Sequence, residues 1–290
     1  MMFGRMNSPK QIKLSLMSFV LPFSVEPALD ALREATAMAM ARHGRADIEV
    51  KADDTLVTDA DRNIEKMLRN RLSVLAPDWS FLGEEGGLVG DADAPCWVID
   101  PIDGTTNYAR DIPLWCISIG AVKDGRPIFG MIAVPELGEI LWAVEGQGAY
   151  QIKNGQTKRL RVRDHLPLQQ EDLLVSNTTV ERVLDFSQVP CRLRNFGALA
   201  YHLTVLARGS VVGMIAHYHK IYDVAAGLCI CFEAGCEARY LDGTQWEAIV
   251  SSESETQPMF CAAPETLEEL LRRLTPKMNS EALKEEQEIE

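Results

Sequence analysis

Apolar residues recur every three or four positions in two segments of the first 80 residues. The first set is Leu29, Leu32, Ala35 and Ala39, and the second is Ile64, Leu68, Leu72 and Leu75. This spacing places each set on one face of a helix, which predicts a helix over about residues 25–42 and a second helix that Pro77 ends. The polar segment 51–61 is typical of a turn, and Asp59 or Asp61 stands where a helix cap is expected.

Short apolar runs separated by turn residues follow the second helix. Residues 81–85 read Phe-Leu-Gly-Glu-Glu, and an apolar run at 96–100 predicts a buried strand. Further strand-like runs cover residues 115–123, 127–134, 140–144 and 149–152. Lys153-Asn-Gly155 is a strong hairpin signal. We therefore expect an antiparallel sheet in the first half of the chain.

Strand-like and helix-like segments alternate in the second half. The segments typical of strands are 173–176, 211–216 and 259–263. The segments typical of helices are 180–186, 198–207, 225–234 and 266–274. Such alternation predicts an α/β sheet. The tail from Lys277 to Glu290 is acidic and lacks a sustained apolar stripe, which predicts that it is frayed or disordered.

Composition limits the class of protein. The chain has 290 residues, of which 47% are hydrophobic, so it can bury a large core as one domain or as two closely joined halves. The formal net charge is −13, which argues against general nucleic-acid binding because phosphate neutralisation needs Lys and Arg. Most of the acidic charge is expected to be solvated surface, although a cation site also requires it. No segment approaches the length that spans a membrane.

The start of the chain resembles a signal peptide only in outline. Arg5, Lys10 and Lys13 precede the apolar run 14–20. Ser15 and Ser18 interrupt that run, Pro22 follows closely, and no small-x-small cleavage site is evident. We therefore expect a cytoplasmic protein with an N-terminal extension over residues 1–23, and Met6 and Met17 remain alternative starts.

The seven cysteines favour packing over disulfides. Their number is odd and they lie in apolar runs, which fits a reducing compartment. Cys229, Cys231 and Cys236 could suggest zinc, but no His stands at ligand spacing and the segment is typical of a buried helix. We interpret these cysteines as core residues.

Residues 97–107, which read Trp-Val-Ile-Asp-Pro-Ile-Asp-Gly-Thr-Thr-Asn, carry the clearest chemical signal. A buried strand would bring Asp100 and Asp103 to its carboxyl end, where open α/β sheets bind their ligands. Carboxylates so placed are hard ligands for Mg²⁺, and the Gly-Thr-Thr turn offers backbone N–H groups and a helix N-terminus to phosphate. Asp-Pro-x-Asp-Gly is also ordinary turn chemistry, so this segment alone does not decide.

Three other segments place carboxylates at the ends of predicted elements. They are Asp61, the pair Glu84 and Glu85, and Asp223. Each has a local explanation as a helix cap or a solvated loop charge. Brought together with Asp100 and Asp103, they would form a cluster whose mutual repulsion demands cations.

The ordered set of motifs resembles the inositol monophosphatase family. The motifs are 56–61 (Leu-Val-Thr-Asp-Ala-Asp), 83–85 (Gly-Glu-Glu), 97–107 and 222–227 (Tyr-Asp-Val-Ala-Ala-Gly), and the match runs from about Val25 to Leu274. The resemblance implies a Mg²⁺-dependent, lithium-sensitive phosphomonoesterase of α/β (α+β) class. It also implies a layered αβαβα sandwich with a mainly antiparallel half and a mixed half. We expect a single domain over residues 24–275, in halves of about 24–155 and 156–275, with a tail at 276–290.

The resemblance also implies roles for particular residues. Glu84, Asp100 and the carbonyl of Ile102 would hold one Mg²⁺, and Asp100, Asp103 and Asp223 a second. Glu84 would support a third ion through water, giving two to three per site. Asp61, Glu84 and Thr105 would orient the attacking water. The residues expected to contact phosphate or substrate are Asp103, Gly104, Thr105, Thr106, Arg194, Gly197 and Ala198.

Two departures from the family pattern bear on the substrate. Tyr222 replaces the usual Trp before the last metal ligand, and Ala216 stands where inositol-specific members carry a Glu that binds substrate hydroxyls. The missing carboxylate weakens the case for inositol monophosphate as the only substrate. Histidinol phosphate, fructose 1,6-bisphosphate and a nucleotide 3′-phosphate are alternatives. A regulatory binding protein that keeps the fold is the alternative from another class.

Residues outside these motifs have no expected part in the chemistry, with one exception. We interpret the five histidines as structural or surface groups, although His217 and His219 could face the leaving group. Family members are commonly dimers, so a homodimer is expected. The stretch Trp115–Ile119 would form either an interface or, as we favour, core.

Overall fold

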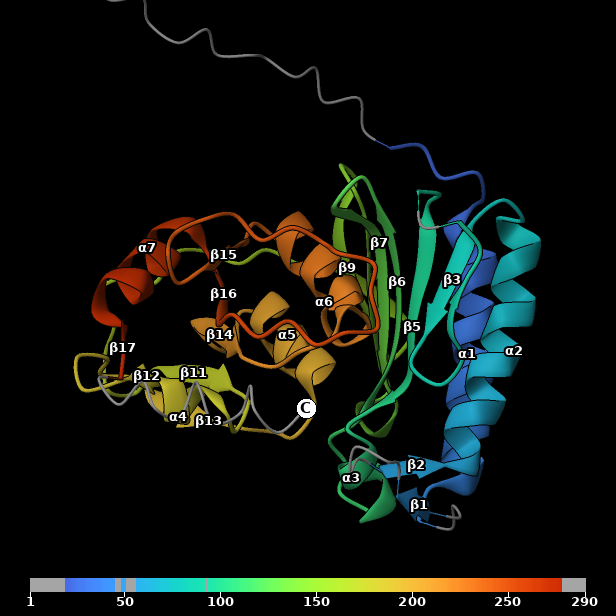
Figure 1. The fold of residues 1–290 in the computed structure, drawn as a ribbon, viewed down its shortest axis with the longest axis horizontal. Helices are drawn as coiled ribbons and strands as arrows, with labels where there is room; N and C mark the ends of the chain where they lie inside the picture. The colour runs from blue at the N-terminus through green and yellow to red at the C-terminus, as the bar shows by residue number, and fades with distance from the viewer. Residues whose placement is uncertain (1–18, 45–47, 51–55, 92, 278–290) are drawn as a thin grey trace, which may run out of the picture.

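A computed structural model describes residues 19–44, 48–50, 56–91 and 93–277 (Figure 1). Its larger sheet has eight strands. In spatial order these are β10 (Gln156–Arg159), β9 (Gly148–Lys153), β8 (Glu139–Val144), β7 (Arg126–Val134), β6 (Cys116–Lys123), β5 (Cys96–Asp103), β3 (Ser80–Gly83) and β4 (Gly87–Val89). Every pair is antiparallel except β3 with β5, which run parallel. The antiparallel sheet expected in the first half is therefore confirmed with one parallel pair added.

The smaller sheet has five strands and mixed direction. In spatial order these are β13 (Arg192–Arg194), β11 (Leu173–Ser176), β14 (Gly213–Ala216), β16 (Met259–Ala262) and β15 (Glu237–Tyr240). The first two pairs are parallel and the last two antiparallel. Two short antiparallel pairs complete the strands: β1 (Ile48–Val50) with β2 (Leu56–Thr58), and β12 (Leu184–Asp185) with β17 (Thr275–Pro276).

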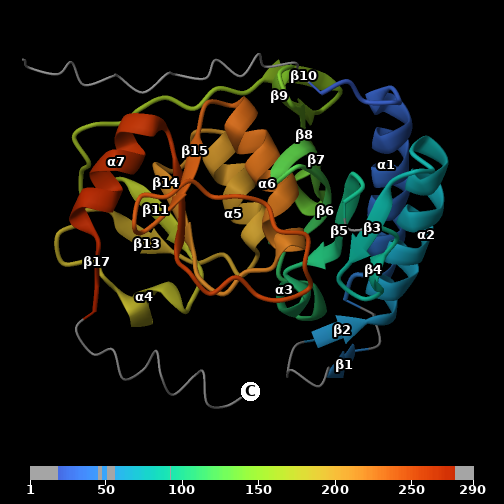
Figure 2. The ribbon, with the colours of Figure 1, turned by 45° about the horizontal axis from the view of Figure 1, so that its top comes forward.

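Helices separate and cover the two sheets. They are α1 (Val25–Arg42), α2 (Asp59–Leu75), α3 (Thr105–Ala109), α4 (Val180–Val183), α5 (Leu199–Ala207), α6 (Ile221–Glu233) and α7 (Pro264–Arg273), with a 3₁₀ turn η1 at Pro135–Leu137. Figures 1 and 2 show α1 and α2 on the outer face of the large sheet, α5 and α6 between the sheets, and α7 outside the small sheet. The predicted αβαβα sandwich of mixed α/β class is confirmed. In the described part of the chain, no helix is long and apolar enough to cross a membrane.

Two glycines let α6 lie unusually close to the large sheet. Gly120 of β6 and Gly130 of β7 are directly paired. A Cβ at Gly130 would lie 2.2 Å from the carbonyl oxygen of Ala226 in α6, and one at Gly120 would lie 3.0 Å from the nitrogen of Ala226. Glycine here has a packing reason, because any side chain would push the helix away from the strands.

Several boundaries differ from the sequence-based prediction. The helix expected over 180–186 ends at Val183, because Leu184 leaves it to pair with Pro276 in β17. The expected turn at 51–61 is wrong for its described residues: Leu56–Thr58 form β2, and Asp59 begins α2. The strand expected over 96–100 continues to Asp103. The predicted hairpin turn is confirmed, with Asn154 and Gly155 both at positive φ (52° and 71°).

The ends of the described chain and the stretch 115–119 join the core. Phe19 and Phe23 pack against Trp79, and Phe23 also contacts Trp97. Packing therefore begins within the predicted extension, of which residues 1–18 lie outside the described residues, as do tail residues 278–290. Trp115 is fully buried, so the core interpretation of that stretch is confirmed. The domain boundaries and the homodimer stay predictions.

Candidate active site

The carboxyl end of β5 brings two aspartates together. β5 is buried along its whole length, and Asp100 and Asp103 are only 3% and 7% exposed. The pairing with β6 shifts register between Asp100 and Asp103, at the position of Pro101, which has no N–H to lose from the ladder. The amide of Ile102 donates to Asp100 Oδ1 at 3.0 Å. This irregular strand end turns both carboxylates toward the same region.

The turn after β5 leads into a helix, as predicted. Gly104 has φ of +86°, and a Cβ there would lie 2.9 Å from the Cβ of Ala198, so conformation and close approach both require glycine. Thr105 begins α3, and its hydroxyl donates to the carbonyl of Ile102 at 3.0 Å. That carbonyl is one of the predicted metal ligands, and the bond from Thr105 leaves it a second lone pair.

Asp103 is held by the N-terminus of α5. Its Oδ1 accepts from the amide of Leu199 at 3.0 Å, and its Oδ2 accepts from Ala200 and Tyr201 at 2.7 and 3.3 Å. Ala198, at the cap position of α5, has no polar side chain, so Asp103 supplies the cap from 96 residues away. The single bond to Oδ1 leaves that oxygen a lone pair for a cation.

Asp61 belongs to the first turn of α2. Thr58 is the cap of this helix, not Asp59 or Asp61 as the sequence suggested, because the Thr58 hydroxyl accepts from the Asp61 amide. In return, Asp61 Oδ2 accepts from the amide of Thr58 at 2.8 Å and from its hydroxyl. Asp61 Oδ1 is buried and has no hydrogen-bond partner among the described residues. One oxygen of Asp61 is thus fixed and the other remains available.

Glu84 follows β3, in a loop anchored from α2. The Glu84 amide donates to the carbonyl of Ile99 at 3.2 Å, and the Glu85 amide donates to Glu65 Oε2 at 2.8 Å. A Cβ at Gly83 would lie 2.3 Å from the carboxyl carbon of Glu65, so the loop closes tightly around this buried carboxylate. Glu65 was missed in the sequence, although it lies four residues after Asp61 and therefore on the same face of α2.

Asp223 enters the site from the first turn of α6. Its Oδ2 accepts from the amide of Lys220 at 2.8 Å. The carbonyl of the preceding residue, Tyr222, accepts from the hydroxyl of Ser118 in β6 at 3.4 Å. Since Ser118 pairs with Asp100, this contact holds the start of α6 beside the end of β5.

Electrostatics shows that the predicted carboxylates converge. Burial raises the pKa of Asp100 well above its usual value, and the negative charges of Glu84, Asp103, Asp223 and Asp61 raise it further. Burial also raises the pKa of Asp61 and of Asp103 to about 7 and that of Asp223 to about 8. Within the described chain, Asp61, Asp100 and Asp103 form no ion pair with Lys or Arg. Lys220 lowers the pKa of Asp223, but among the described residues the cluster as a whole carries an excess of negative charge.

The predicted substrate residues separate into two groups. Gly197 and Ala198 lie against Gly104, since a Cβ at Gly104 would be 3.3 Å from the Gly197 carbonyl oxygen. Arg194, in contrast, is exposed in β13, and its guanidinium bonds to the carbonyl of Leu193 at 2.8 Å. Within the described chain it forms no hydrogen bond or ion pair with the carboxylates.

A second missed residue, Asn107, joins the two substrate segments. Its amide nitrogen donates to the carbonyls of Phe196 and Leu114 at 2.7 and 2.6 Å. This buried side chain fixes the backbone just before Gly197 against α3. Its position directly after the Gly-Thr-Thr turn was the available signal in the sequence.

The remaining candidate groups are buried. Ala216 is fully buried at the end of β14. His217 and His219 are also buried, and burial with the charge of His217 lowers the pKa of His219 to about 4. All seven cysteines are free and buried, as expected. The Sγ atoms of Cys231, Cys236 and Cys261 lie within 4.8 Å of one another, a trio that differs from the one the sequence suggested.

Comparisons with known proteins agree with this arrangement. A family model described as the inositol monophosphatase family matches residues 22–277. A fructose-1,6-bisphosphatase/inositol-1-monophosphatase of Aquifex aeolicus is 32% identical over 66% of this chain and 74% of its own. A histidinol-phosphatase of Streptomyces coelicolor is 34% identical over 68% and 77%. The solved structure of a Thermotoga maritima IMPase superposes with a TM-score of 0.73 at 26% identity, covering 86% of this chain and 95% of that one.

Proposed function

The chain belongs to the inositol monophosphatase family, and from this premise we propose that it hydrolyses a small phosphate monoester at the carboxylate cluster with the help of Mg²⁺. The observation that carries the proposal is the convergence of Asp61, Asp100, Asp103 and Asp223, of which the first three are buried and form no ion pair with Lys or Arg within the described chain. Buried like charges destabilise a fold unless a ligand compensates them. A protein that only binds a macromolecular partner would have no need of this cluster.

The residues fit a divalent cation. All the proposed ligand atoms are oxygens, which hard cations such as Mg²⁺ prefer, and no described residue donates a hydrogen bond to the buried Asp61 Oδ1. Following the family pattern, Glu84, Asp100 and the Ile102 carbonyl would hold one ion, and Asp100, Asp103 and Asp223 a second. A bound cation would neutralise phosphate charge and lower the pKa of water.

The chain itself supplies position and orientation. Thr58 fixes one oxygen of Asp61, so the other can accept a proton from a water molecule held against Thr105. The N-terminus of α5 fixes the plane of the Asp103 carboxylate. Backbone N–H groups at Gly104, Thr105 and Thr106 would face the phosphate. No Cys, Ser or His nucleophile is needed, because a positioned water attacks directly.

For the substrate, we propose a polyol or sugar phosphate or a related alcohol phosphate. Inositol monophosphate is the reference candidate, and Ala216 argues against exclusive preference for it because no carboxylate there binds ring hydroxyls. Relatives named for histidinol phosphate and fructose 1,6-bisphosphate make those esters the next to test. We place the activity in a homodimer in the cytoplasm, and we expect inhibition by Li⁺.

Phosphate release from a panel of these esters tests the proposal. We expect release to require Mg²⁺, to stop with EDTA and to fall by at least about a thousandfold in Asp100→Asn, since charge stabilisation is usually the largest catalytic term. Asp78→Asn, an exposed aspartate, is the matched control. Release that persists without divalent cations, or survives in Asp100→Asn, would refute the proposal. Sizing chromatography and activity against Li⁺ concentration test the remaining parts.

A further inference from the structure

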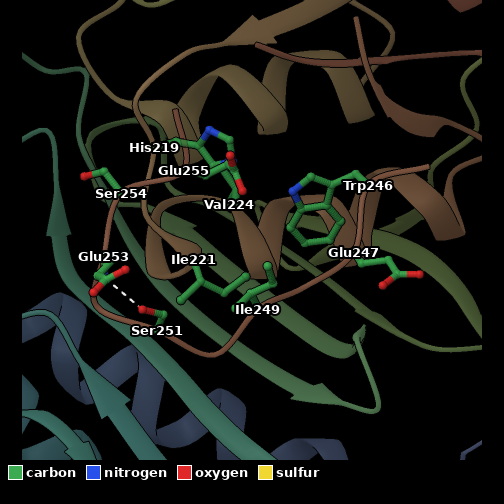
Figure 3. A pocket seen from close by; sticks show the side chains of 10 residues that line it. All are labelled: His219, Ile221, Val224, Trp246, Glu247, Ile249, Ser251, Glu253, Ser254 and Glu255. Carbon is green, nitrogen blue, oxygen red and sulfur yellow. Dashed lines mark hydrogen bonds between the residues drawn. The ribbon is translucent and has the colours of Figure 1, made fainter. Parts of the chain in front are cut away.

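A small cavity lies beside the first turn of α6, outside the carboxylate cluster. It has a volume of about 130 Å³ and lies between α6 and the loop 246–255 that joins β15 to β16 (Figure 3). Ile221 and Val224 of α6, together with Trp246 and Ile249, give it apolar walls. An apolar cavity of about 150 Å³ can hold benzene, so this one suits a group of about that size.

The rim of the cavity is negatively charged. Three carboxylates, Glu247, Glu253 and Glu255, line it, and none of its lining residues is Lys or Arg. His219 adds no positive charge at neutral pH, because burial and His217 lower its pKa to about 4. A phosphate or carboxylate ligand would be repelled here, whereas a cation would be attracted.

Two further groups favour a ligand with an N–H donor and an apolar body. His219 is 2% exposed, and its Nδ1 has no hydrogen-bond partner among the described residues. Figure 3 shows His219 and Glu255 together on one side of the cavity, with the indole of Trp246 across from them. The flat indole offers an apolar contact surface to the body of such a ligand.

From these features we propose that this cavity binds a small organic ammonium ion. Its charged nitrogen lies toward Glu255 and His219, and its apolar part lies against Trp246 and Ile221. Two kinds of molecule could bring this ammonium group to the cavity. The first is a substrate, a phosphate ester whose alcohol part carries an amine, and the second is a free amine that regulates the enzyme. The first source rests on the proposed function, and the second requires only binding.

The cavity is connected to the candidate active site through backbone contacts. His219 and Glu255 exchange backbone hydrogen bonds at 3.2 and 2.7 Å. The amide of the next residue, Lys220, donates to Asp223 Oδ2 at 2.8 Å. In the sequence, Asp223 lies between the cavity residues Ile221 and Val224. An occupant that orders the loop 246–255 therefore also orders the turn that holds Asp223.

A binding experiment on the full chain tests the cavity independently of turnover. The probes are benzylamine and its uncharged analogue benzyl alcohol, compared by calorimetry. We expect benzylamine to bind about tenfold more tightly, a difference of about 1.4 kcal/mol. This preference should disappear in the Glu253→Gln/Glu255→Gln double variant and persist in Glu181→Gln, which removes an exposed carboxylate of α4. Equal binding of the two probes, or a preference that the double variant keeps, would overturn the inference.

A kinetic experiment then distinguishes the two sources. If the substrate carries the amine, the kcat/KM ratio of histidinol phosphate to glycerol phosphate should fall about tenfold in Glu255→Gln, in line with the loss of one neighbouring charge. If a free amine is the ligand, benzylamine should change turnover of glycerol phosphate without competing with it. Either result supports the ammonium site. If no ester is hydrolysed, the proposed function fails, while the binding result still decides the inference.

Discussion

Replacing Gly130 by Ala tests whether the close approach of α6 to the large sheet fixes the position of Asp223. A Cβ at Gly130 would lie 2.2 Å from the carbonyl oxygen of Ala226 and 2.9 Å from the Cβ of Cys229. The first contact is with backbone, so no change of rotamer relieves it. The helix must move away from β7, and Asp223 at its first turn must move with it.

The magnitude follows from the size of that overlap. Ordinary contacts begin at about 3.4 Å, so relief requires a shift of about 1 Å, which forfeits up to half the dispersion energy along the affected contacts. Overpacking costs about 1–3 kcal/mol, and a backbone collision belongs at the upper end. Replacing a strand glycine returns about 0.5–1 kcal/mol. We therefore expect a net destabilisation of about 2 kcal/mol and a decrease in Tm of about 5 °C.

The assay combines thermal unfolding with turnover. A displacement of about 1 Å at a catalytic group can cost about a hundredfold in rate, so kcat should fall much more than stability alone explains. Gly120→Ala is the matched control, because its Cβ would meet Ala226 at 3.0 Å, and we expect less than half of either effect. If Gly130→Ala melts and turns over like wild type, or if Gly120→Ala is the more damaging change, the close approach does not position Asp223.

Two further predictions concern the carboxylates. Glu65→Leu leaves the partly buried Glu85 amide without its acceptor, a loss of about 1–3 kcal/mol that should raise the Mg²⁺ concentration for half-maximal activity. Glu65→Gln keeps an acceptor oxygen and should be milder, and equal effects of the two variants would contradict the anchoring role. The folded-state pKa values of Asp61, Asp103 and Asp223 are raised to about 7, 7 and 8, so the folded state binds more protons than the unfolded state above about pH 4. The free energy of unfolding of the metal-free protein should therefore decrease as the pH rises from about 4 toward 8, and added Mg²⁺ should restore it. Thermal unfolding in EDTA measures this. A Tm that rises over the same pH range would show that these carboxyl groups are not protonated in the folded state.

Local signals made part of this protein predictable. The helix at Val25–Arg42 follows from its own apolar spacing, and the turn at Gly104 follows from residues within three positions of it. In contrast, β12 and β17 each contain two residues and exist because segments about 90 positions apart meet. Such short strands have no pattern of their own, which is why the helical spacing at 180–186 was misleading.

The site shows the same division. Asp100 and Asp103 could be found from the sequence because an apolar run ends directly at them. The part of Glu65 could not, since it depends on a loop 20 residues away that closes around its carboxylate. Nor does any pattern near Asp103 indicate that it caps α5, because the three amides that it accepts from belong to a helix nearly 100 residues later.

The position of α6 links stability, chemistry and the proposed ammonium site in one element. Its middle rests on Gly120 and Gly130, its first turn carries Asp223, and the outer side of that turn forms a wall of the cavity. Because the helix is packed against backbone, it can move only as a whole, and a change at one of these places is felt at the others. The chemistry therefore depends on two strand glycines that carry no chemical group, and a search confined to polar residues would have overlooked them.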